Sequence, residues 1–544
     1  MKNLSLKCIT LLVVIVLFAR CVSVQKYNSC VIAKHSPKEL KKDVDFAYKK
    51  LKKFHPDLYW YISEDSLDAN FNNLKNSITD SLTSRDFYLQ FAPVLASIGQ
   101  GHTSVKPPLL KQTREDKKEK GEASNIFKPF DFKNINNRLF ITHNFGKDSA
   151  IISGVEIVSV DNQNINELVK SFMPLTTSDG YNKTFVPEYV YRNFDSFYTY
   201  THQPKDSILL TLSMGDSTFN HYIKRQYVKP KEYEQKDSVK SKVDTLAKIV
   251  LKDTIEVEKL SKDERKQKRA EAKLKRQWKR QHGYNEYTKL CYRNFKFIEA
   301  DSALNVAYMK IRVFTKGDYK KFYNKCFEQI DSAKCNTLVI DLRGNTGGRL
   351  SEIDYLYSFL TDKEYLFIER AKMTKRTSYL YNSLHSGSVG GVIGSVIFSP
   401  ILITHNLLKV SSKDHSVYFK FGSSKIKKPK ENNFKGKIYV LVDGMSFSAS
   451  CILSTHLKAT KRATFVGKET GGAYNGTVAG IFAMIELPAS KLNIRAGLMT
   501  IKTPYSVNPD GYGIKPDVEI TSVKFGEDNE LNWVLNQVKN VNNK

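Results

Sequence analysis

The stretch "TLVIDLRGNTGG", Thr337–Gly348, combines a short apolar run with a glycine turn, and the helical pattern "LSEIDYLYSFLT" follows it from Leu350. A buried strand that runs through a turn into a helix is the repeating unit of an α/β fold. Further strand and helix patterns alternate around it, including "LNVAYMKIRVF" and "GKIYVLVDG". The sequence therefore predicts an α/β domain over residues 286–544.

The glycine turn of this stretch has three interpretations. Gly347 and Gly348 can let the backbone approach a ligand and turn its N–H groups outward, which suits an oxyanion hole. A phosphate-binding loop is the second interpretation, but the Gly-Lys-Ser/Thr core of such loops is missing. A simple tight turn is the third.

A second junction of strand and helix contains three serines. The stretch "LVDGMSFSASCILSTHLKA", Leu441–Ala459, starts as an apolar strand pattern and ends as a helix pattern. Ser448 stands where the helix begins, close to free helix N–H groups. Ser446 lies nearer the strand, and Ser450 would enter the first helical turn, where a capping or packing role is usual. One of these hydroxyls is a candidate nucleophile.

The chain opens with "MKNLSLKCITLLVVIVLFARCVSVQKYN", in which an apolar run from Ile9 to Phe18 follows two lysines. The run is too short for a membrane span and is typical of a secretory signal over residues 1–21. The segment "LFARC" resembles a bacterial lipoprotein signal, which implies lipidation of Cys21. Arg20 departs from the small residue expected there, so cleavage to a soluble exported form remains open. The expected location is the cell envelope, as a periplasmic or outer-membrane lipoprotein.

Residues 36–110 are predicted to form a helical N-terminal unit. The stretch "SPKELKKDVDFAYKKLKKFHPDLYWYI" has apolar residues at helical spacing, with Ser36 as the cap and Pro37 in the first turn. The unit ends in "LASIGQGHTSV", where glycines break the helix just before His102. A lone histidine in a loop is ordinarily a surface or structural residue. A fixed turn relieved by glycine is also where a general base can be placed.

Short alternating strands are predicted over residues 120–225, and "GVEIVSVDNQNI" resembles the core of a PDZ domain, although any small β sandwich could contain it. Residues 226–285 form an insertion with the strongly basic stretch "KLSKDERKQKRAEAKLKRQWKR", Lys259–Arg280. It is predicted to be an exposed helix. Its surface would suit anionic lipid headgroups or an acidic partner, or it is simply a solvated helical insertion.

Composition narrows the class of protein. The chain has 544 residues, too many for one hydrophobic core, and its 41% apolar content excludes a mostly disordered protein. The net charge of +29 comes from lysines spread over the whole length, which argues against a nucleic-acid partner. Beyond Cys21 no CxxC spacing occurs, so neither a disulfide framework nor a metal site is predicted. The remaining cysteines after that position are Cys30, Cys291, Cys326, Cys335 and Cys451.

Four motifs together carry a specific resemblance. "LVIDLRGNTGG", "VLVDGMSFSAS", "VGKETGG" and the closing "GYGIKPDVEI" resemble the tail-specific, or C-terminal processing, serine peptidases and their tricorn-core relatives. The N-terminal "FHPDLYWY" and "GQGHTSV" resemble the tricorn-like branch. The similarity extends over about residues 36–517, interrupted by the basic insertion and by a glycine-rich stretch near 386–403. It implies an exported serine peptidase with a crotonase-related α/β core that needs no metal or organic cofactor.

The resemblance also assigns roles to residues. The nucleophile of the family is the first serine of Ser-Ala-Ser, here Ser448. The backbone N–H of Ala449, with that of Gly347 or Gly348, would hold the oxyanion. The implied substrates are peptides, or unfolded and C-terminal segments of proteins.

One departure from the family decides the expected mechanism. Serine-lysine peptidases carry a base in Thr-Phe-Gly-Lys-Gly, whereas Gly-Gly-Ala follows Thr470 here and Lys468 is out of register. The resemblance to the tricorn-like branch then implies His102 as the base and Asp510 as the carboxylate that orients it. Asp510 is one methylene shorter than the glutamate of that branch. Gly101 replaces the serine that stands beside the branch's histidine.

A noncatalytic alternative remains. The same fold in the retinoid-binding relatives holds ligands and cleaves nothing, so the chain could be a ligand- or peptide-binding protein. The sequence predicts neither the cleavage specificity nor the oligomeric state.

Overall fold

The structure is a computed structural model that describes residues 23–228, 261–301, 304–378, 381, 404, 408–413, 416–520 and 524–542. The predicted signal over residues 1–21, the lipidation site Cys21 and the glycine-rich stretch at 386–403 lie outside these residues. Within the described ranges, no helix has the length and apolar character required to cross a bilayer.

The α/β domain is built on a six-stranded sheet with the order β12-β13-β14-β20-β21-β24. Its strands are β12 (Arg293–Asp301), β13 (Leu304–Ile311), β14 (Thr337–Asp341), β20 (Lys437–Val442), β21 (Thr464–Gly467) and β24 (Val518–Glu519). The strands from β13 to β24 run parallel, and β12 pairs antiparallel with β13. All five residues of β14 are buried, which explains why its sequence is an unbroken run instead of an alternation.

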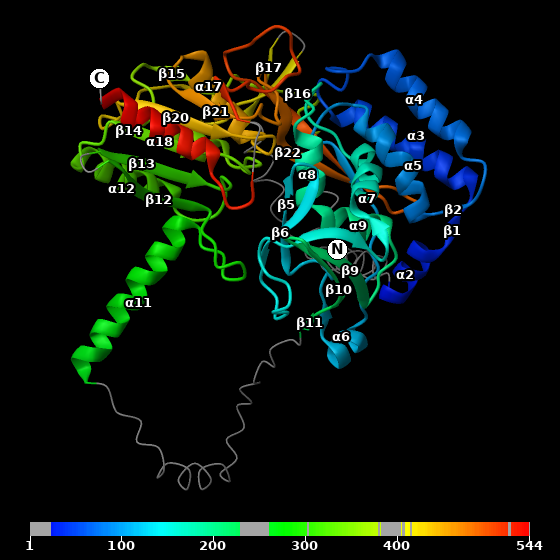
Figure 1. The fold of residues 1–544 in the computed structure, drawn as a ribbon. Helices are drawn as coiled ribbons and strands as arrows, with labels where there is room; N and C mark the ends of the chain where they lie inside the picture. Colours follow the sequence, from blue (N-terminus) through cyan, green and yellow to red (C-terminus); the bar gives the residue numbers. More distant parts are fainter. Residues whose placement is uncertain are drawn as a thin grey trace, which may run out of the picture.

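Helices cover both faces of this sheet (Figure 1). They are α12 (Tyr319–Ser332), α13 (Leu350–Tyr357), α17 (Ala449–Ala459) and α18 (Asn529–Asn542). Val339 and Leu441 pack against Val534 of α18, whereas Leu338 and Ile340 face the main core together with α12, α13 and α17. Each strand thus contributes alternate side chains to the two faces.

A second sheet has the order β17-β18-β16-β23-β22, and β3 is added at β23. Its strands are β3 (Ser104–Lys106), β16 (Ala371–Met373), β17 (Val410–Lys413), β18 (Ser416–Phe419), β22 (Thr477–Glu486) and β23 (Asn493–Ile501), while β15 (Tyr365–Leu366) pairs separately with β19 (Ile426–Lys427). Ser104 lies opposite Arg495 in the β3–β23 ladder. This pairing joins the N-terminal unit to the C-terminal part of the chain.

The N-terminal unit is helical, as the sequence predicts. It contains α2 (Val24–Ile32), α3 (Pro37–Phe54), α4 (Glu64–Ser77) and α5 (Ser84–Ala96), with β1 (Lys34–His35) paired to β2 (Leu82–Thr83). Ser36 caps α3 because its hydroxyl accepts from the Glu39 N–H while the Glu39 carboxylate accepts from the Ser36 N–H. Apolar residues of α3, α4 and α5 form a shared core.

The β module has a sheet of order β10-β9-β7-β6-β5. Its elements are α6 (Arg114–Lys120), β4 (Glu122–Ala123), β5 (Phe130–Ile135), β6 (Arg138–Asn144), β7 (Glu156–Val160), β8 (Gln163–Asn164), α7 (Ile165–Phe172), η1 (Met173–Leu175), α8 (Phe185–Arg192), α9 (Phe194–Thr201), β9 (Ser207–Met214), β10 (Ser217–Lys224) and β11 (Tyr227–Val228). The expectation of strands alone misses α8 and α9. Their aromatic residues favour strands locally, but tertiary packing decides the conformation: Tyr191, Phe194 and Tyr198 are buried in the main core, and Phe185 is buried against Met445 and Phe447.

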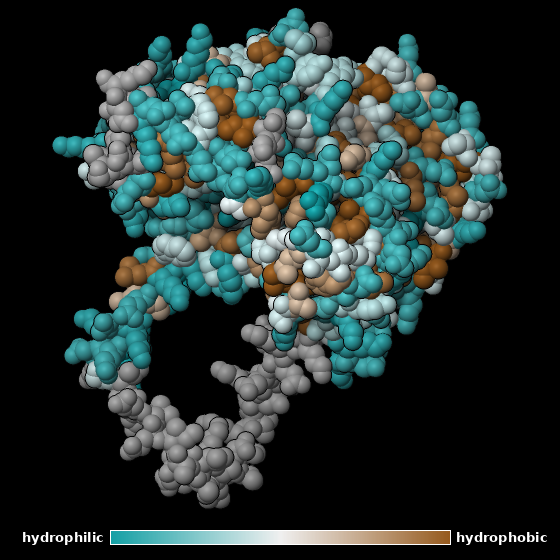
Figure 2. All heavy atoms as spheres, viewed as in Figure 1, coloured by the Kyte–Doolittle hydropathy of each residue, from teal (hydrophilic) through white to brown (hydrophobic). Residues whose placement is uncertain are grey.

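The basic stretch forms α11 (Lys262–His282), which projects from the α/β domain (Figure 1). Ser261 caps its start, and Gly283 ends it in the left-handed conformation. Figure 2 shows a mostly hydrophilic surface along this projecting helix. Leu274 and Trp278, one turn apart, are 65% and 45% exposed, so the predicted exposed helix is present and its apolar residues are not buried in a core.

Candidate active site

Ser448 stands at the junction of β20 and α17, where the chain turns sharply into the helix. Its backbone has φ 56° and ψ −117°, a conformation that an L-residue adopts at a cost of roughly 1–3 kcal/mol. The hydroxyl forms no capping hydrogen bond to α17. The turn therefore holds a half-buried serine hydroxyl that is free to interact with another residue.

That residue is His102, whose Nε2 lies 2.9 Å from Ser448 Oγ although the two are 346 positions apart in sequence. His102 follows the glycine turn after α5 and immediately precedes Thr103 and β3. The Thr103 hydroxyl lies 3.1 Å from Nε2 of the buried His55. The pairing of β3 with β23 and this contact fix the position of the His102 backbone.

The other two serines of the junction have structural partners. The buried Ser446 hydroxyl donates to Leu342 O at 2.9 Å and accepts from Asp443 N at 3.1 Å. The buried Ser450 hydroxyl donates to Asn345 O at 2.8 Å. Of the three, the structure brings only Ser448 to His102.

Two backbone N–H groups beside Ser448 are free to hold an oxyanion. Gly347 cannot supply one, because its N–H donates to the Asn345 side chain at 2.8 Å. In the described residues the N–H groups of Gly348 and Ala449 have no acceptor. A Cβ on Gly347 would lie 2.8 Å from Ala449 N and from Ser448 Cβ, so only glycine permits this close approach. Of the two glycines expected from the sequence, Gly348 has the available N–H.

Gly101 anchors the turn that precedes His102 through its backbone N–H. Its N–H donates to the carboxylate of buried Asp179 at 2.8 Å. Burial raises the pKa of Asp179 to about 6, against the hydrogen bonds it accepts. A Cβ on Gly101 would meet the ring of Phe447 at 2.6 Å. A serine at this position would therefore require the Phe447 ring to shift.

The ring of His102 lies in an aromatic and cationic environment. The rings of Phe447 and Phe482 are 5.0 Å and 5.4 Å from its centroid. Arg495 Nη1 lies 3.5 Å from His102 Nδ1. Burial, and secondly the charge of Arg495, lower the pKa of His102 to about 3. The imidazole is therefore neutral at physiological pH, as a general base must be.

Asp510 does not contact His102 in this structure. Its carboxylate accepts from Trp60 Nε1 at 2.8 Å and from the Gly511 N–H at 2.5 Å. Among the residues that the structure describes, the group at His102 Nδ1 is the guanidinium of Arg495. In the described part of the chain Lys468 has no contact with Ser448 either. Burial raises the pKa of Glu188 to about 7, and the charge of Lys468 partly opposes this shift.

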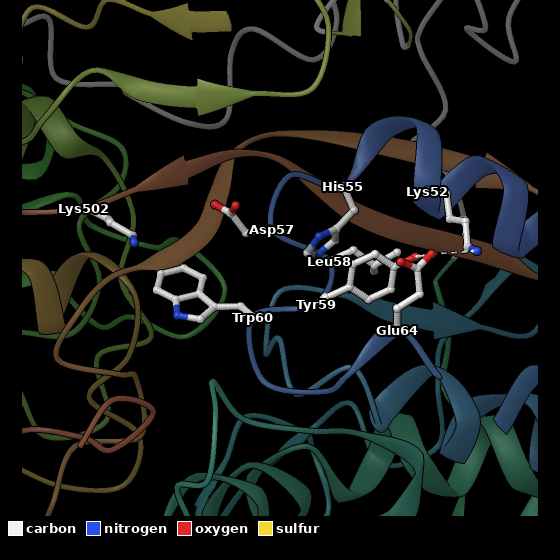
Figure 3. A pocket seen from close by; sticks show the side chains of 8 residues that line it. All are labelled: Lys52, His55, Asp57, Leu58, Tyr59, Trp60, Glu64 and Lys502. Atoms are coloured by element: carbon white, nitrogen blue, oxygen red, sulfur yellow. Dashed lines mark hydrogen bonds and ion pairs between the residues drawn. The ribbon is translucent and has the colours of Figure 1, made fainter. Parts of the chain in front are cut away.

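A cavity of about 640 Å³ lies at the end of α3 and along the segment that follows it (Figure 3). It is lined by Lys52, His55, Asp57, Leu58, Tyr59, Trp60, Glu64 and Lys502. Neither Ser448 nor His102 lines it. Residues of the "FHPDLYWY" motif thus line a pocket that does not include the Ser448–His102 pair, and the indole N–H of Trp60 donates from this pocket to Asp510.

Sequence reasoning missed three residues of the site. Asn345 links the glycine turn to the serine turn, since its side chain binds the Gly347 N–H and its carbonyl accepts from Phe447 N. Asp179 and Arg495 lie far from the motifs in sequence and reach the site only through the fold. Asn345 could have been found from the sequence, because it lies inside the motif "RGNTGG". No local sequence pattern marks Asp179 or Arg495.

Comparison with known proteins gives a family and a fold. Residues 305–520 match the family model for peptidase family S41. No curated protein matches the chain. The solved structures that are similar to it include a mutant of CPAF, at 14% identity with a TM-score of 0.57, covering 92% of this chain and 96% of that chain. Mature CPAF complexed with lactacystin is another, at 14% identity with a TM-score of 0.56, covering 93% of this chain and 98% of that chain. At such identity the likeness concerns the fold.

Proposed function

The chain belongs to the serine peptidases of family S41, and we propose that Ser448 is its nucleophile and His102 its general base. The family and the mixed α/β multidomain fold expected from the sequence are confirmed. The observation that supports the proposed roles is the 2.9 Å separation of His102 Nε2 and Ser448 Oγ. A neutral imidazole at this distance can take the proton of the hydroxyl.

In the proposed reaction, Ser448 Oγ attacks the carbonyl carbon of the scissile peptide bond while its proton passes to His102 Nε2. The N–H groups of Gly348 and Ala449 hold the oxygen that becomes negatively charged. The C–N bond then breaks, the imidazolium gives its proton to the leaving amine, and an acyl ester remains on Ser448. Water, deprotonated by the same imidazole, hydrolyses the ester and restores the serine.

We propose Asp510 as the carboxylate that orients His102 in the working enzyme. An imidazole that accepts a proton at Nε2 carries its hydrogen at Nδ1, and a carboxylate bonded there stabilises the imidazolium. The loop of Asp510 lies near the histidine turn, because Gly511 O accepts from Tyr181 N at 2.7 Å and Gly180 N donates to Gly99 O at 2.8 Å. The Asp510 carboxylate has to break its hydrogen bond with Trp60 Nε1 before it can bind His102 Nδ1.

Asp510→Asn is expected to lower kcat by roughly 10²- to 10⁴-fold, as the loss of a triad carboxylate does, while folding is preserved. Trp60→Phe is the matched control, because it removes the N–H that holds Asp510 but keeps the carboxylate; its turnover should persist. Asp517→Asn should weaken folding instead, since Asp517 accepts from Phe465 N at 2.8 Å and pairs with Lys458. Near-normal kcat in Asp510→Asn would remove Asp510 from the mechanism.

Labelling with a fluorophosphonate tests the proposed function itself. The reagent should modify Ser448 alone, as peptide mass spectrometry can determine, because phosphonylation needs an activated hydroxyl. A noncatalytic binding protein would not react. Since the lowered pKa keeps His102 neutral, the labelling rate should stay near its maximum down to about pH 5 and fall below about pH 4. Circular dichroism at each pH controls for unfolding, and a midpoint near pH 6.5 would contradict the lowered pKa.

We also propose that the β module captures substrate chains in the manner of a PDZ domain and that the protein is an exported lipoprotein anchored through Cys21. Support for the first comes from the sheet edge at β10, where Phe219 and Tyr222 are exposed beside unpaired backbone. Support for the second is the N-terminal sequence alone. Mass spectrometry of the mature N-terminus would identify a lipid-modified Cys21 or an unmodified end.

A further inference from the structure

Arg495 is a cation placed beside the reacting residues. It lies on β23 opposite Ser104 of β3, and its Nη1 is 3.3 Å from His102 O and 3.5 Å from His102 Nδ1. Its guanidinium carbon lies 3.4 Å from the ring centroid of Phe482. The aromatic face and the histidine backbone together fix the guanidinium on the far side of the imidazole from Ser448.

The charge of Arg495 is not neutralised within the described part of the chain. No carboxylate there lies within ion-pair distance of its guanidinium. Burial lowers the pKa of Arg495, and the phenol of Tyr189 opposes this shift only in part. Its Nε and Nη2 have no acceptor among the described residues. A half-buried cation without a carboxylate partner is unfavourable, and a planar guanidinium with free N–H groups is suited to bind a carboxylate through two hydrogen bonds.

The resting contact is also unproductive for the proposed mechanism. A guanidinium can only donate hydrogen bonds, so the 3.5 Å contact with His102 Nδ1 favours the tautomer in which that nitrogen keeps its lone pair. In that tautomer the ring hydrogen sits on Nε2, and only the other tautomer can accept the proton of Ser448 there. Turnover therefore requires the guanidinium to move away from Nδ1, and a carboxylate bound to it would favour that movement.

We propose that Arg495 binds a carboxylate of the substrate, so that the enzyme prefers peptides with an acidic group next to the scissile bond. This inference rests on the proposed function and names the substrate class of the same site. The carboxylate has two possible sources, the side chain of an aspartate or glutamate and the free end of the peptide chain. When the substrate carboxylate binds, it holds the substrate and also draws the Arg495 guanidinium away from His102 Nδ1. The acidic group of the substrate should therefore affect both KM and kcat.

The test compares matched peptides on the full-length protein. One pair of peptides differs by glutamate or glutamine next to the cleaved bond, and a second pair has a free or an amidated C-terminus. The wild-type protein should cleave the acidic member of at least one pair with a roughly 10- to 100-fold higher kcat/KM, as charge-assisted hydrogen bonds provide. If glutamine in place of glutamate lowers kcat/KM, Arg495 binds a side-chain carboxylate. If amidation of the C-terminus lowers it, Arg495 binds the free end of the peptide chain.

Arg495→Gln should reduce this ratio to near one, and Arg495→Lys should leave an intermediate ratio because it keeps the charge without the planar fork. Lys106→Gln is the matched control. Lys106 is an exposed cation of β3 in the same ladder, facing Asn493, and its removal should leave the ratio unchanged.

Three outcomes would overturn the inference. The first is a wild-type enzyme that is labelled at Ser448 and cleaves peptides without acidic preference; the proposed function then survives. The second is an Arg495→Gln variant that slows both members of a pair equally and keeps their ratio, as a purely structural residue would. The third is a protein with neither labelling nor cleavage, in which case the proposed function fails and the inference fails with it.

Discussion

Ser448→Ala should abolish peptide hydrolysis, lowering kcat by roughly 10⁵- to 10⁶-fold, as removal of the nucleophile does in serine peptidases. Folding should be nearly unaffected, because the hydroxyl makes no capping hydrogen bond and its contact is with His102 alone. Alanine retains the strained backbone of the turn, so the free energy of unfolding should change by less than about 0.5 kcal/mol. Peptide turnover and thermal unfolding, measured on the same preparation, check both expectations.

The neighbouring serines are the matched controls. Ser446→Ala and Ser450→Ala remove buried hydroxyls that satisfy backbone groups, so each should lower the free energy of unfolding by about 1–3 kcal/mol. Both variants should still turn over substrate. If Ser450 proved indispensable for turnover and Ser448 did not, the assignment of the nucleophile would be wrong by two residues.

His102→Ala should lower kcat by roughly 10⁴- to 10⁶-fold, because the base and the nucleophile act as a unit and the loss of either removes most of the catalysis. Lys468→Ala is the matched control for a serine-lysine mechanism. It should leave turnover nearly unchanged, since Lys468 has no contact with Ser448 in the described residues and its charge acts on Glu188.

The comparison of these two variants also separates the possible mechanisms. Fluorophosphonate labelling should fall with His102→Ala in parallel with peptide turnover, because both reactions need the same deprotonation. An enzyme that survives without His102 and loses activity without Lys468 would restore the lysine as the base.

Local sequence patterns predict much of the fold and mark Ser448 as the candidate nucleophile. The run from Thr337 to Gly348 is a fully buried strand followed by a turn, and such a run is visible without tertiary information. Ser448 was identifiable because the strand-to-helix junction and the family motif coincide there. The helices α8 and α9 were missed because burial against the β module, not residue propensity, decides their conformation.

The environment of His102 could not be predicted in the same way. Arg495 reaches the ring only because β23 pairs with β3, and strand pairing over such a distance in sequence has no local signal. Asp510 illustrates the opposite case, because the family motif marks its position but not its side-chain partner. Trp60, from the far end of the chain, provides that partner through its indole N–H.

The pairing of β3 with β23 has a consequence for how the protein is made. His102 leaves the ribosome hundreds of residues before Ser448, and β3 has no partner strand until residues 493–501 have been synthesised. A nascent chain folds from its N-terminus, so its helical unit can form early while the nucleophile and base remain apart. Truncated or stalled chains that end before β23 cannot assemble the Ser448–His102 pair. Peptidase activity is therefore expected only after nearly the whole chain has been translated.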